Sequence, residues 1–364
     1  MASQARELAD KSIAPPGRRN LIINGAMNVA QRGTTHTLSA NTSLYGIDRW
    51  RLTKVAMDQL VLGYDQSSEV PTGQGFEKSL LVNVDTAETA LASDEYSYLR
   101  YAAEGQDLQQ LSYGSSSAKS LTLSFWVRSS VTGDYGILAY NGGGDRGYTV
   151  KYTVNAANTW EKKTITISGD TSGSLSDDNT LGLGFYFNLG SGSGFYGNGT
   201  ESWGQYFNNQ LTVPTQVNLH ATQNNKFYLT GVQLEVGSTA TEFEHRSFGE
   251  ELALCQRYFQ YYENPPIRGV ATDTGSANRL AMVLPVVMRA NPSLTLQQTG
   301  SSHFRVYDGT VTATYSSFNA LWLRTNKIEL DIIVTGNSLT IGRAACVYDS
   351  VNTYESAFLI DAEL

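Results

Sequence analysis

Apolar and polar side chains alternate along many stretches of this chain. Residues 121–128 give the clearest example, because an apolar side chain occupies every second position from Leu121 to Val127. Successive side chains of a β-strand point to opposite faces, so this period of two predicts a strand that is buried on one face. The opposite face of the predicted strand carries Trp126 and Arg128.

Residues 148–154 alternate in the same way, with Tyr148 and Val150 on the apolar face. A turn over residues 155–159 then leads to a segment that contains Ile165 and Ile167. Two short alternating runs joined by a turn are typical of a β-hairpin. We therefore expect these two strands to pair with each other.

Residues 181–189 predict another strand, with Leu and Phe side chains on one face. Its other face is formed by Gly182, Gly184, Tyr186 and Asn188. Glycine weakens a strand, so two glycines on one face predict a bulge or the close approach of another group. Residues 190–210 follow as a Gly-, Ser- and Asn-rich loop with several aromatic side chains. A loop of this length is expected to be functional or to pack against a partner chain.

One segment carries a helix signal. Ser247-Phe-Gly-Glu250 matches a capping box, and Leu252, Cys255 and Tyr258 follow at helical spacing. The pair Pro265-Pro266 then breaks the pattern.

The strand pattern returns after the two prolines. Strands are expected at 280–288, 321–324, 327–334, 338–347 and 357–364. Pro285 indicates that the first of these is an edge strand or is bulged, because proline cannot donate a hydrogen bond to a neighbouring strand. Turn sequences at Asp308-Gly309 and Gly336-Asn337 favour a second, smaller sandwich.

These patterns together predict a mainly β protein. We expect a jelly-roll β-sandwich over residues 20–246, a short helical connector over 247–263 and a smaller antiparallel β-sandwich over 264–364. A length of 364 residues suits two or three such units. Residues 1–19 lack a period and predict an N-terminal arm, with a short helix over residues 3–9, that docks on a neighbour.

Composition and charge exclude some classes of partner. The net charge is −8 and no basic stripe is present, which argues against nucleic-acid binding. The N-terminal residues lack the apolar core of a signal peptide, and no run of about 18 apolar residues occurs anywhere. The sequence therefore predicts synthesis in the cytoplasm and no insertion into a membrane.

The chain lacks the motifs of common enzymes. Its four histidines, His36, His220, His245 and His303, have no ligand-spaced neighbours, and no nucleophile-elbow, zinc-protease or P-loop motif occurs. We therefore expect no enzymatic activity, no catalytic residues, no metal and no cofactor. Asp177-Asp178-Asn179 is a weak calcium candidate, because one loop supplies too few oxygen ligands.

The two cysteines, Cys255 and Cys346, lie far apart in the sequence. They form no CxxC pair, and we expect each to be a buried free thiol.

Side chains on the polar faces of two strands are the better candidates for a function. Sugars dock on aromatic faces, while amide and guanidinium groups bind their hydroxyls. We therefore predict that Trp126, Arg128, Tyr186 and Asn188 form a glycan platform. The alternative is that a second sheet, a loop or a neighbouring subunit covers them, because aromatic side chains of large β-proteins are mostly buried.

Several segments resemble phage virion proteins. They are Asn20–Gly33, Asp48–Trp50, Phe125–Arg128, Phe227–Gly237, Thr241–Arg246, Leu254–Tyr262 and Phe358–Leu364. Their order and spacing are similar to those of tail-fibre-like and other virion structural proteins with a jelly roll like that of carbohydrate-binding modules. The resemblance implies a virion location, oligomerisation that is often threefold, and glycan binding as a candidate activity. It carries over no catalytic residue.

Three hypotheses about function follow. The leading one is a tail or fibre appendage component of a bacteriophage, present as an oligomer, with a trimer favoured. Its partners would be other virion proteins, and its candidate ligand is a host-surface polysaccharide. The second is a capsid decoration or cement protein. The third, a capsule depolymerase, is less favoured because such enzymes usually need a repetitive β-helix or an acidic cleft, and the chain shows no repeat.

Overall fold

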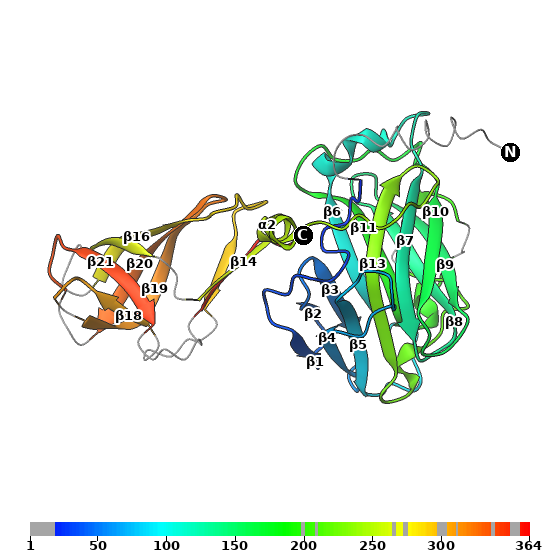
Figure 1. The fold of residues 1–364 in the computed structure, drawn as a ribbon, viewed down its shortest axis with the longest axis horizontal. Coiled ribbons are helices and arrows are strands. Elements are labelled where there is room, and N and C mark those ends of the chain that lie inside the picture. The colour runs from blue at the N-terminus through cyan, green and yellow to red at the C-terminus, as the bar shows by residue number, and fades with distance from the viewer. Residues whose placement is uncertain are drawn as a thin grey trace. The chain divides into compact units, whose positions relative to one another are not determined.

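The structure, a computed structural model, consists mostly of β-strands, which confirms the mainly β fold class (Figure 1). The chain forms two compact units, of which one ends at Glu251 and includes Leu364, and the other spans Leu252–Glu363. The structure describes residues 19–197, 201–207, 210–263, 267–271, 276–296, 304–310, 312–335, 339–349 and 357–364. The expected helix over residues 3–9 lies outside these ranges.

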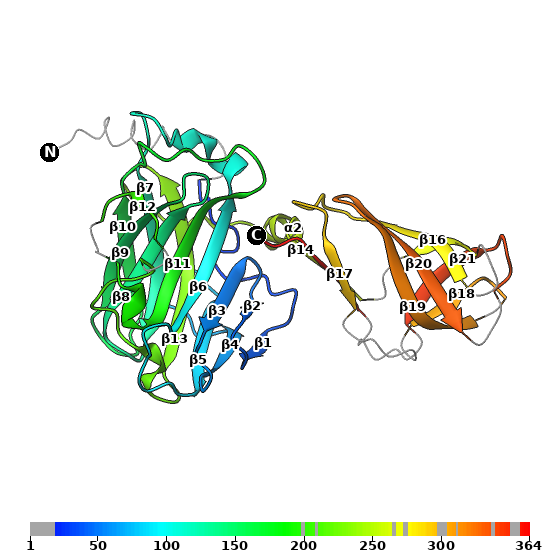
Figure 2. The same cartoon turned by 180° about the vertical axis from the view of Figure 1, so that it is seen from behind.

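Two antiparallel sheets make up the larger unit (Figures 1 and 2). The six-stranded sheet contains, in spatial order, β1 (Thr35–Leu38), β4 (Val61–Ser67), β5 (Ser79–Thr86), β13 (Lys226–Val236), β7 (Leu121–Ser129) and β10 (Glu161–Ile167). The seven-stranded sheet contains β12 (Gly204–Gln205), β9 (Arg146–Val154), β8 (Gly133–Asn141), β11 (Leu181–Ser191), β6 (Tyr96–Glu104), β3 (Trp50–Val55) and β2 (Ser43–Tyr45). The chain passes repeatedly from one sheet to the other, as expected for a jelly-roll sandwich.

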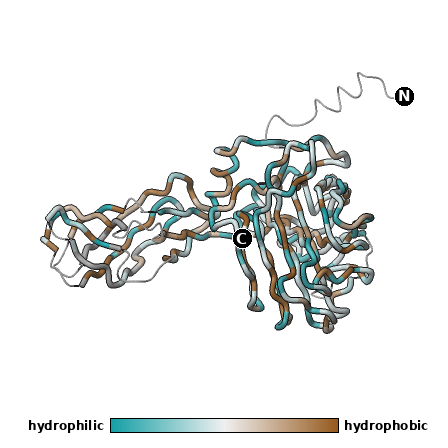
Figure 3. Tube along the Cα trace, turned by 60° about the horizontal axis from the view of Figure 1, so that its bottom comes forward, coloured by the Kyte–Doolittle hydropathy of each residue, from teal (hydrophilic) through white to brown (hydrophobic). Residues whose placement is uncertain are grey.

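The apolar faces of the two sheets meet in the core. Phe125 on β7 packs against Phe187 on β11 with ring centroids 5.3 Å apart, and Phe187 lies 6.0 Å from Trp50 on β3. All three side chains are fully buried. Apolar and polar residues alternate along the strands in Figure 3. The apolar faces predicted for residues 121–128 and 181–189 are therefore confirmed.

The predicted hairpin between residues 148–154 and the segment with Ile165 and Ile167 is wrong. Strand β9 pairs with β8 and β12, whereas β10 pairs with β7 in the other sheet. Both strands turn their apolar faces into the core, but from opposite sides. A period of two identifies the buried face of each strand and does not say in which sheet the strand lies.

The glycines of β11 have the role that the sequence predicts. The pairing of β11 with β6 shifts register between Leu181 and Leu183, which marks a bulge at Gly182. A Cβ atom on Gly182 would lie 2.7 Å from the Cα atom of Gly105. Another part of the backbone therefore approaches this strand too closely for a side chain.

The aromatic loop after β11 packs largely on its own unit. Phe195 lies 4.4 Å from Tyr96 and Tyr206 lies 4.9 Å from Tyr140, measured between ring centroids. Phe207 is the exception, because 59% of its surface is exposed. Much of this loop therefore needs no partner chain to cover its aromatic side chains.

The helix signal is confirmed at its start. Helix α2 spans Phe248–Gln256, and the backbone N–H of Glu250 donates to the hydroxyl oxygen of Ser247 at 3.3 Å. The helix ends earlier than the predicted connector, because residues 259–263 form strand β14.

The smaller unit is antiparallel, as predicted, but six of its strands close into a barrel instead of forming a sandwich. The barrel order is β15 (Arg268–Ala271), β16 (Ser276–Val283), β20 (Lys327–Thr335), β19 (Thr312–Leu323), β18 (Phe304–Tyr307) and β21 (Ala344–Asp349). A separate sheet contains β14 (Phe259–Glu263), β22 (Ala357–Asp361) and β17 (Ser293–Leu296). The pairings of β16 and β19 shift register, and such bulges bend strands enough to close a barrel.

Strand ends in the smaller unit differ from the predicted ones. Strand β16 ends at Val283, before Pro285, and β21 begins at Ala344 instead of residue 338. The predicted turn at Asp308-Gly309 is confirmed, since it joins β18 to β19 and Gly309 has a φ of +88°. The predicted turn at residues 336–337 lies outside the described residues.

Candidate functional site

The four residues predicted to form a glycan platform lie on two different sheets. Trp126 and Arg128 belong to β7 in the six-stranded sheet, and Tyr186 and Asn188 belong to β11 in the seven-stranded sheet. All four point away from the core between the sheets. The structure therefore does not bring them together into one surface.

Tyr186 and Asn188 are largely covered. Asn188 is fully buried, and its amide donates to the Ser191 hydroxyl at 2.6 Å. The Tyr186 ring lies 5.0 Å from the ring of Tyr98, and burial raises the pKa of its hydroxyl. The Tyr206 ring of the following loop packs against the same cluster of aromatic side chains. Coverage by a loop was the alternative to the platform, and it describes this part of the sheet.

Arg128 interacts with side chains that surround it on the outer face of its sheet. Its guanidinium forms an ion pair with Glu69 at 2.9 Å and lies 5.1 Å from the centre of the Tyr228 ring. Trp160 in turn lies 5.9 Å from Tyr228. These side chains form an aromatic and charged strip on the outer face of the six-stranded sheet.

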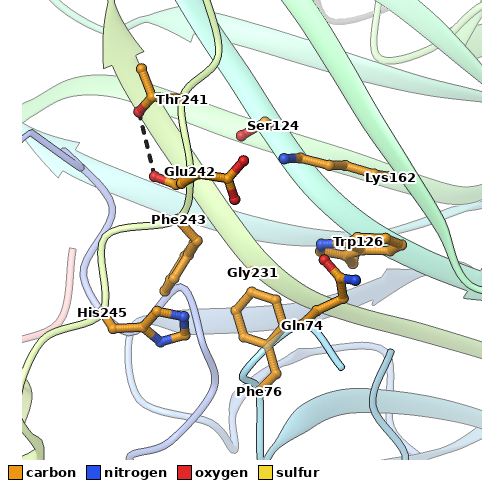
Figure 4. Close-up of a pocket in the computed structure, with 10 residues that line it drawn as sticks. All are labelled: Gln74, Phe76, Ser124, Trp126, Lys162, Gly231, Thr241, Glu242, Phe243 and His245. Atoms are coloured by element: carbon orange, nitrogen blue, oxygen red, sulfur yellow. Dashed lines mark hydrogen bonds between the residues drawn. The ribbon is translucent and has the colours of Figure 1, made fainter. Parts of the chain in front are cut away.

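Trp126 lines an open pocket on that outer face, with a volume of about 160 Å³ (Figure 4). The other lining residues are Gln74, Phe76, Ser124, Lys162, Gly231, Thr241, Glu242, Phe243 and His245. They come from β7, β10, β13 and two connecting segments. The pocket therefore combines aromatic surface with amide, hydroxyl and charged groups.

A bulge in β13 shapes the pocket. The pairing of β13 with β7 shifts register between Thr230 and Gln233. Gly231 at the bulge has a left-handed φ of +61°, and a Cβ atom there would lie 2.5 Å from the Phe76 ring. Only glycine combines this backbone conformation with room for the aromatic ring.

Three rings form one wall of the pocket. Phe76 lies 5.0 Å from Phe243 and 5.4 Å from His245, and Phe243 lies 4.9 Å from His245. A hydrogen bond holds the segment that carries Phe243 and His245 against β13. The Thr241 hydroxyl donates it to the Glu235 carboxylate at 2.6 Å.

Two charged side chains face each other across the pocket. Lys162 on β10 is the strand neighbour of Trp126, and its ammonium group points toward the carboxylate of Glu242 (Figure 4). Both side chains are exposed. Among the described residues neither forms an ion pair within 4.0 Å, so both charges remain available to a ligand.

The structure places one histidine beside a serine hydroxyl, a group that can act as a nucleophile. The sequence did not predict this contact. His220 and Ser97 are both fully buried, and the Nε2 atom of His220 lies 2.5 Å from the Ser97 hydroxyl. Burial, followed by the charge of Lys54, lowers the pKa of His220 to about 3. No substrate can reach this pair in the folded state, so it supports structure and not catalysis.

The calcium candidate does not gather ligands. The Asp178 carboxylate accepts hydrogen bonds from the backbone N–H and hydroxyl of Thr180, at 2.9 and 2.5 Å, and these bonds lower its pKa. Within the described part of the chain no group of three or more His, Cys, Asp or Glu side chains is placed to hold a metal ion. Cys255 is buried and outside any disulfide, as predicted, and Cys346 is also outside any disulfide but only partly buried. In the same residues no helix is long and apolar enough to span a membrane.

Sequence reasoning found Trp126 and missed the rest of its pocket. Phe243 and His245 lie in the segment 241–246 that carries part of the resemblance to phage proteins. Lys162 could have been found from strand pairing, since it lies opposite Trp126. Finding it required knowing that β10 pairs with β7, and the hairpin prediction paired the β10 segment with the β9 segment instead.

The comparisons with known proteins find matches among solved structures only. No protein-family model matches the chain, and no curated protein matches it in sequence.

Three solved structures illustrate that likeness. The enzymatically active domain of bacteriophage CBA120 tailspike protein 4 is 10% identical over 60% of this chain, with a TM-score of 0.33, and the match spans 21% of the tailspike domain. TmCBM61, solved with β-1,4-galactotriose, is 9% identical over 60% of this chain and 99% of its own, with a TM-score of 0.30. A family 11 carbohydrate-binding module from Clostridium thermocellum is 15% identical over 57% of this chain and 98% of its own, with a TM-score of 0.26. At these values the likeness carries nothing about ligands.

Proposed function

We propose that this chain is a structural protein of a bacteriophage particle, in a tail or fibre appendage, and that its Trp126 pocket binds a glycan of the host surface. One observation carries the glycan proposal. An indole ring lines an open pocket beside an ammonium and a carboxylate group that lack ion-pair partners among the described residues.

The pocket has the chemistry that a sugar needs. The C–H faces of a sugar ring pack against an indole, while its hydroxyls bind polar side chains such as Gln74, Lys162 and Glu242. A volume of about 160 Å³ is many times the roughly 10–15 Å³ that one water molecule needs, so the pocket has room for a ligand larger than water. Because the pocket is open, the remainder of a polysaccharide would continue over the outer face of the sheet.

Binding is favoured over cleavage at this site. Glycosidases need two carboxyl groups that flank the scissile bond. Of the described residues that line the pocket, Glu242 is the one with a carboxylate. The proposal therefore assigns the protein a binding role and no enzymatic activity.

The test compares two tryptophans. Wild type, Trp126→Ala and Trp322→Ala are screened on an array of bacterial surface polysaccharides. Trp322 is a suitable control because it is 49% exposed and belongs to the smaller unit. We expect Trp126→Ala to weaken binding about tenfold or more, since an aromatic contact contributes about 0.5–1.5 kcal/mol beyond its buried area. If Trp126→Ala binds like wild type while remaining folded, or if wild type binds no polysaccharide, the pocket is not a glycan site.

The virion location and oligomeric state are part of the same proposal. The smaller unit exposes large apolar side chains, with Val283 77%, Ile341 62% and Val287 56% exposed. Exposed apolar surface is typical of interfaces, and copies of this chain, in a trimer, or other virion proteins would cover it. A chain that sediments only as a monomer at micromolar concentration would argue against the oligomer. An image of the particle would separate an appendage from a capsid decoration or cement protein.

A further inference from the structure

The Trp126 pocket places a pair of opposite charges next to a wall of rings. In Figure 4 the ammonium group of Lys162 and the carboxylate of Glu242 point toward each other, and the rings of Phe76, Phe243 and His245 gather beside them. The centroids of the three rings are 4.9 to 5.4 Å apart. A chemical group that fits both parts of the pocket needs polar atoms next to an apolar end.

The two charges restrict the charge of the ligand. Lys162 and Glu242 are both exposed, so a ligand can reach either of them. A carboxylate would bind Lys162 and be repelled by Glu242, whereas an ammonium group would bind Glu242 and be repelled by Lys162. A neutral group avoids both repulsions if it offers a donor to the carboxylate and an acceptor to the ammonium group. The pocket therefore favours a neutral group with a donor and an acceptor on opposite sides.

A secondary amide has this arrangement. Its N–H and C=O lie in one plane and point in opposite directions in the trans form. Hydrogen bonds to charged partners are about twice as strong as those between neutral groups, so both ends of the amide would gain from this pocket. In an acetamido group the methyl is the apolar end, which the ring wall can cover. A hydroxyl also donates and accepts, but it has no apolar end for the rings to contact.

We infer that the Trp126 pocket selects a sugar that carries an acetamido group. The amide N–H would donate to the Glu242 carboxylate, the C=O would accept from the Lys162 ammonium group, and the methyl would pack against Phe76 and Phe243. Trp126 is the strand neighbour of Lys162, and its indole would contact the sugar ring that bears the group. The inference rests on the proposed function and names the class of sugar for that same site.

The test uses three trisaccharides with one β-1,4-linked backbone. Triacetylchitotriose, chitotriose and cellotriose carry an acetamido, an amino and a hydroxyl group at the same carbon of each ring. Titration calorimetry on the full chain therefore isolates the contribution of this group. We expect wild type to bind triacetylchitotriose about tenfold or more tightly than either of the others. Its preference over cellotriose should change little with salt, because both of these ligands are neutral.

Variants assign the preference to the charged pair. Lys162→Met removes the donor to the carbonyl and should reduce the preference over cellotriose to less than about threefold. Lys226→Met is the matched control, since Lys226 is exposed on β13 of the same sheet and does not line the pocket, and it should keep the wild-type preference. Glu242→Gln keeps an acceptor oxygen without the charge and should give an intermediate preference. Trp126→Ala should weaken the binding of both trisaccharides about equally.

The preference between two ligands is a readout that a purely structural effect of a variant would not change, and unfolding midpoints will show that each variant is folded. Wild type that binds triacetylchitotriose no more tightly than cellotriose or chitotriose, or that binds none of the three, would overturn the inference. A preference retained by Lys162→Met would also overturn it.

The polysaccharide array separates failure of this inference from failure of the proposed function. If wild type binds a polysaccharide on the array through Trp126 but shows no preference for the acetamido group, the glycan site stands and the acetamido assignment is rejected. If wild type binds neither the array nor the trisaccharides, both are rejected.

Discussion

Acid should destabilise the larger unit through one buried histidine. His220 is fully buried, and its pKa is lowered to about 3, first by burial and then by the charge of Lys54. In the unfolded chain a histidine has a pKa near 6.5. Between these two values the unfolded state binds a proton that the folded state does not. Stability therefore falls as the pH decreases from about 6.5 toward 3.

The size of this effect follows from the difference in pKa. Each unit of difference corresponds to about 1.4 kcal/mol, so the loss should approach about 2 kcal/mol at pH 5 and about 5 kcal/mol near pH 3. A domain of ordinary stability has about 5–15 kcal/mol in total. One side chain thus accounts for a considerable part of the acid sensitivity of this unit.

Denaturant titrations at pH 7.5, 6 and 5 will check this prediction. The transition of the larger unit can be followed by the fluorescence of its tryptophans, among them the fully buried Trp50. His220→Gln removes the titrating ring, so its stability should change by about 2 kcal/mol less than that of wild type between pH 7.5 and 5. Ser97→Ala removes the hydrogen-bond partner and leaves the ring buried, so it should keep the wild-type pH slope. Equal slopes for His220→Gln and wild type would refute the reasoning.

Two further substitutions test how the Trp126 pocket is held. Gly231→Ala should destabilise the protein by about 1–2 kcal/mol or more, because Gly231 has a left-handed φ of +61° and an added Cβ atom would lie 2.5 Å from the Phe76 ring. Gly204→Ala is the control: a Cβ atom there has open space around it, so this variant should be nearly neutral in thermal unfolding. Arg246→Ala should cost about 3–5 kcal/mol in denaturant titrations, because its side chain is only 5% exposed and pairs with Glu244 and Glu251 at 3.1 and 3.3 Å. Lys327→Ala, which breaks a pair whose lysine is 45% exposed, should cost less than about 1 kcal/mol, and equal losses for the two would contradict the role of burial.

The sequence predicted which side chains face the core, because that information is local. Alternation placed Phe125 and Phe187 inside and Trp126 and Tyr186 outside, and the structure agrees. Alternation could not show that β7 and β11 belong to opposite sheets. Two outward side chains of a sandwich can lie on opposite surfaces of the molecule, so the predicted platform was divided between two faces.

The candidate site could not be predicted in full either, because the sequence does not show which strands pair. The Trp126 pocket needs Lys162 from β10, which lies next to β7. This pairing joins segments that are distant in the sequence, and neither segment carries a signal for its partner. Gly231 can be read from the sequence, but its role at the bulge depends on how β13 pairs with the neighbouring strand β7.

The wall of the Trp126 pocket and the beginning of the described chain share one ionic network, and this decides which variants can test the pocket. Arg246 donates to the main-chain oxygen of Ile22 at 3.0 Å and pairs with Glu244, whose backbone N–H donates to Gln233 on β13 at 2.8 Å. A change in segment 241–246 would therefore alter stability and pocket shape together. Trp126 is on β7, and no described ion pair or hydrogen bond of its side chain belongs to this network. Loss of binding in Trp126→Ala with an unchanged unfolding midpoint can therefore be assigned to the contact with the sugar, whereas loss of binding in Arg246→Ala cannot.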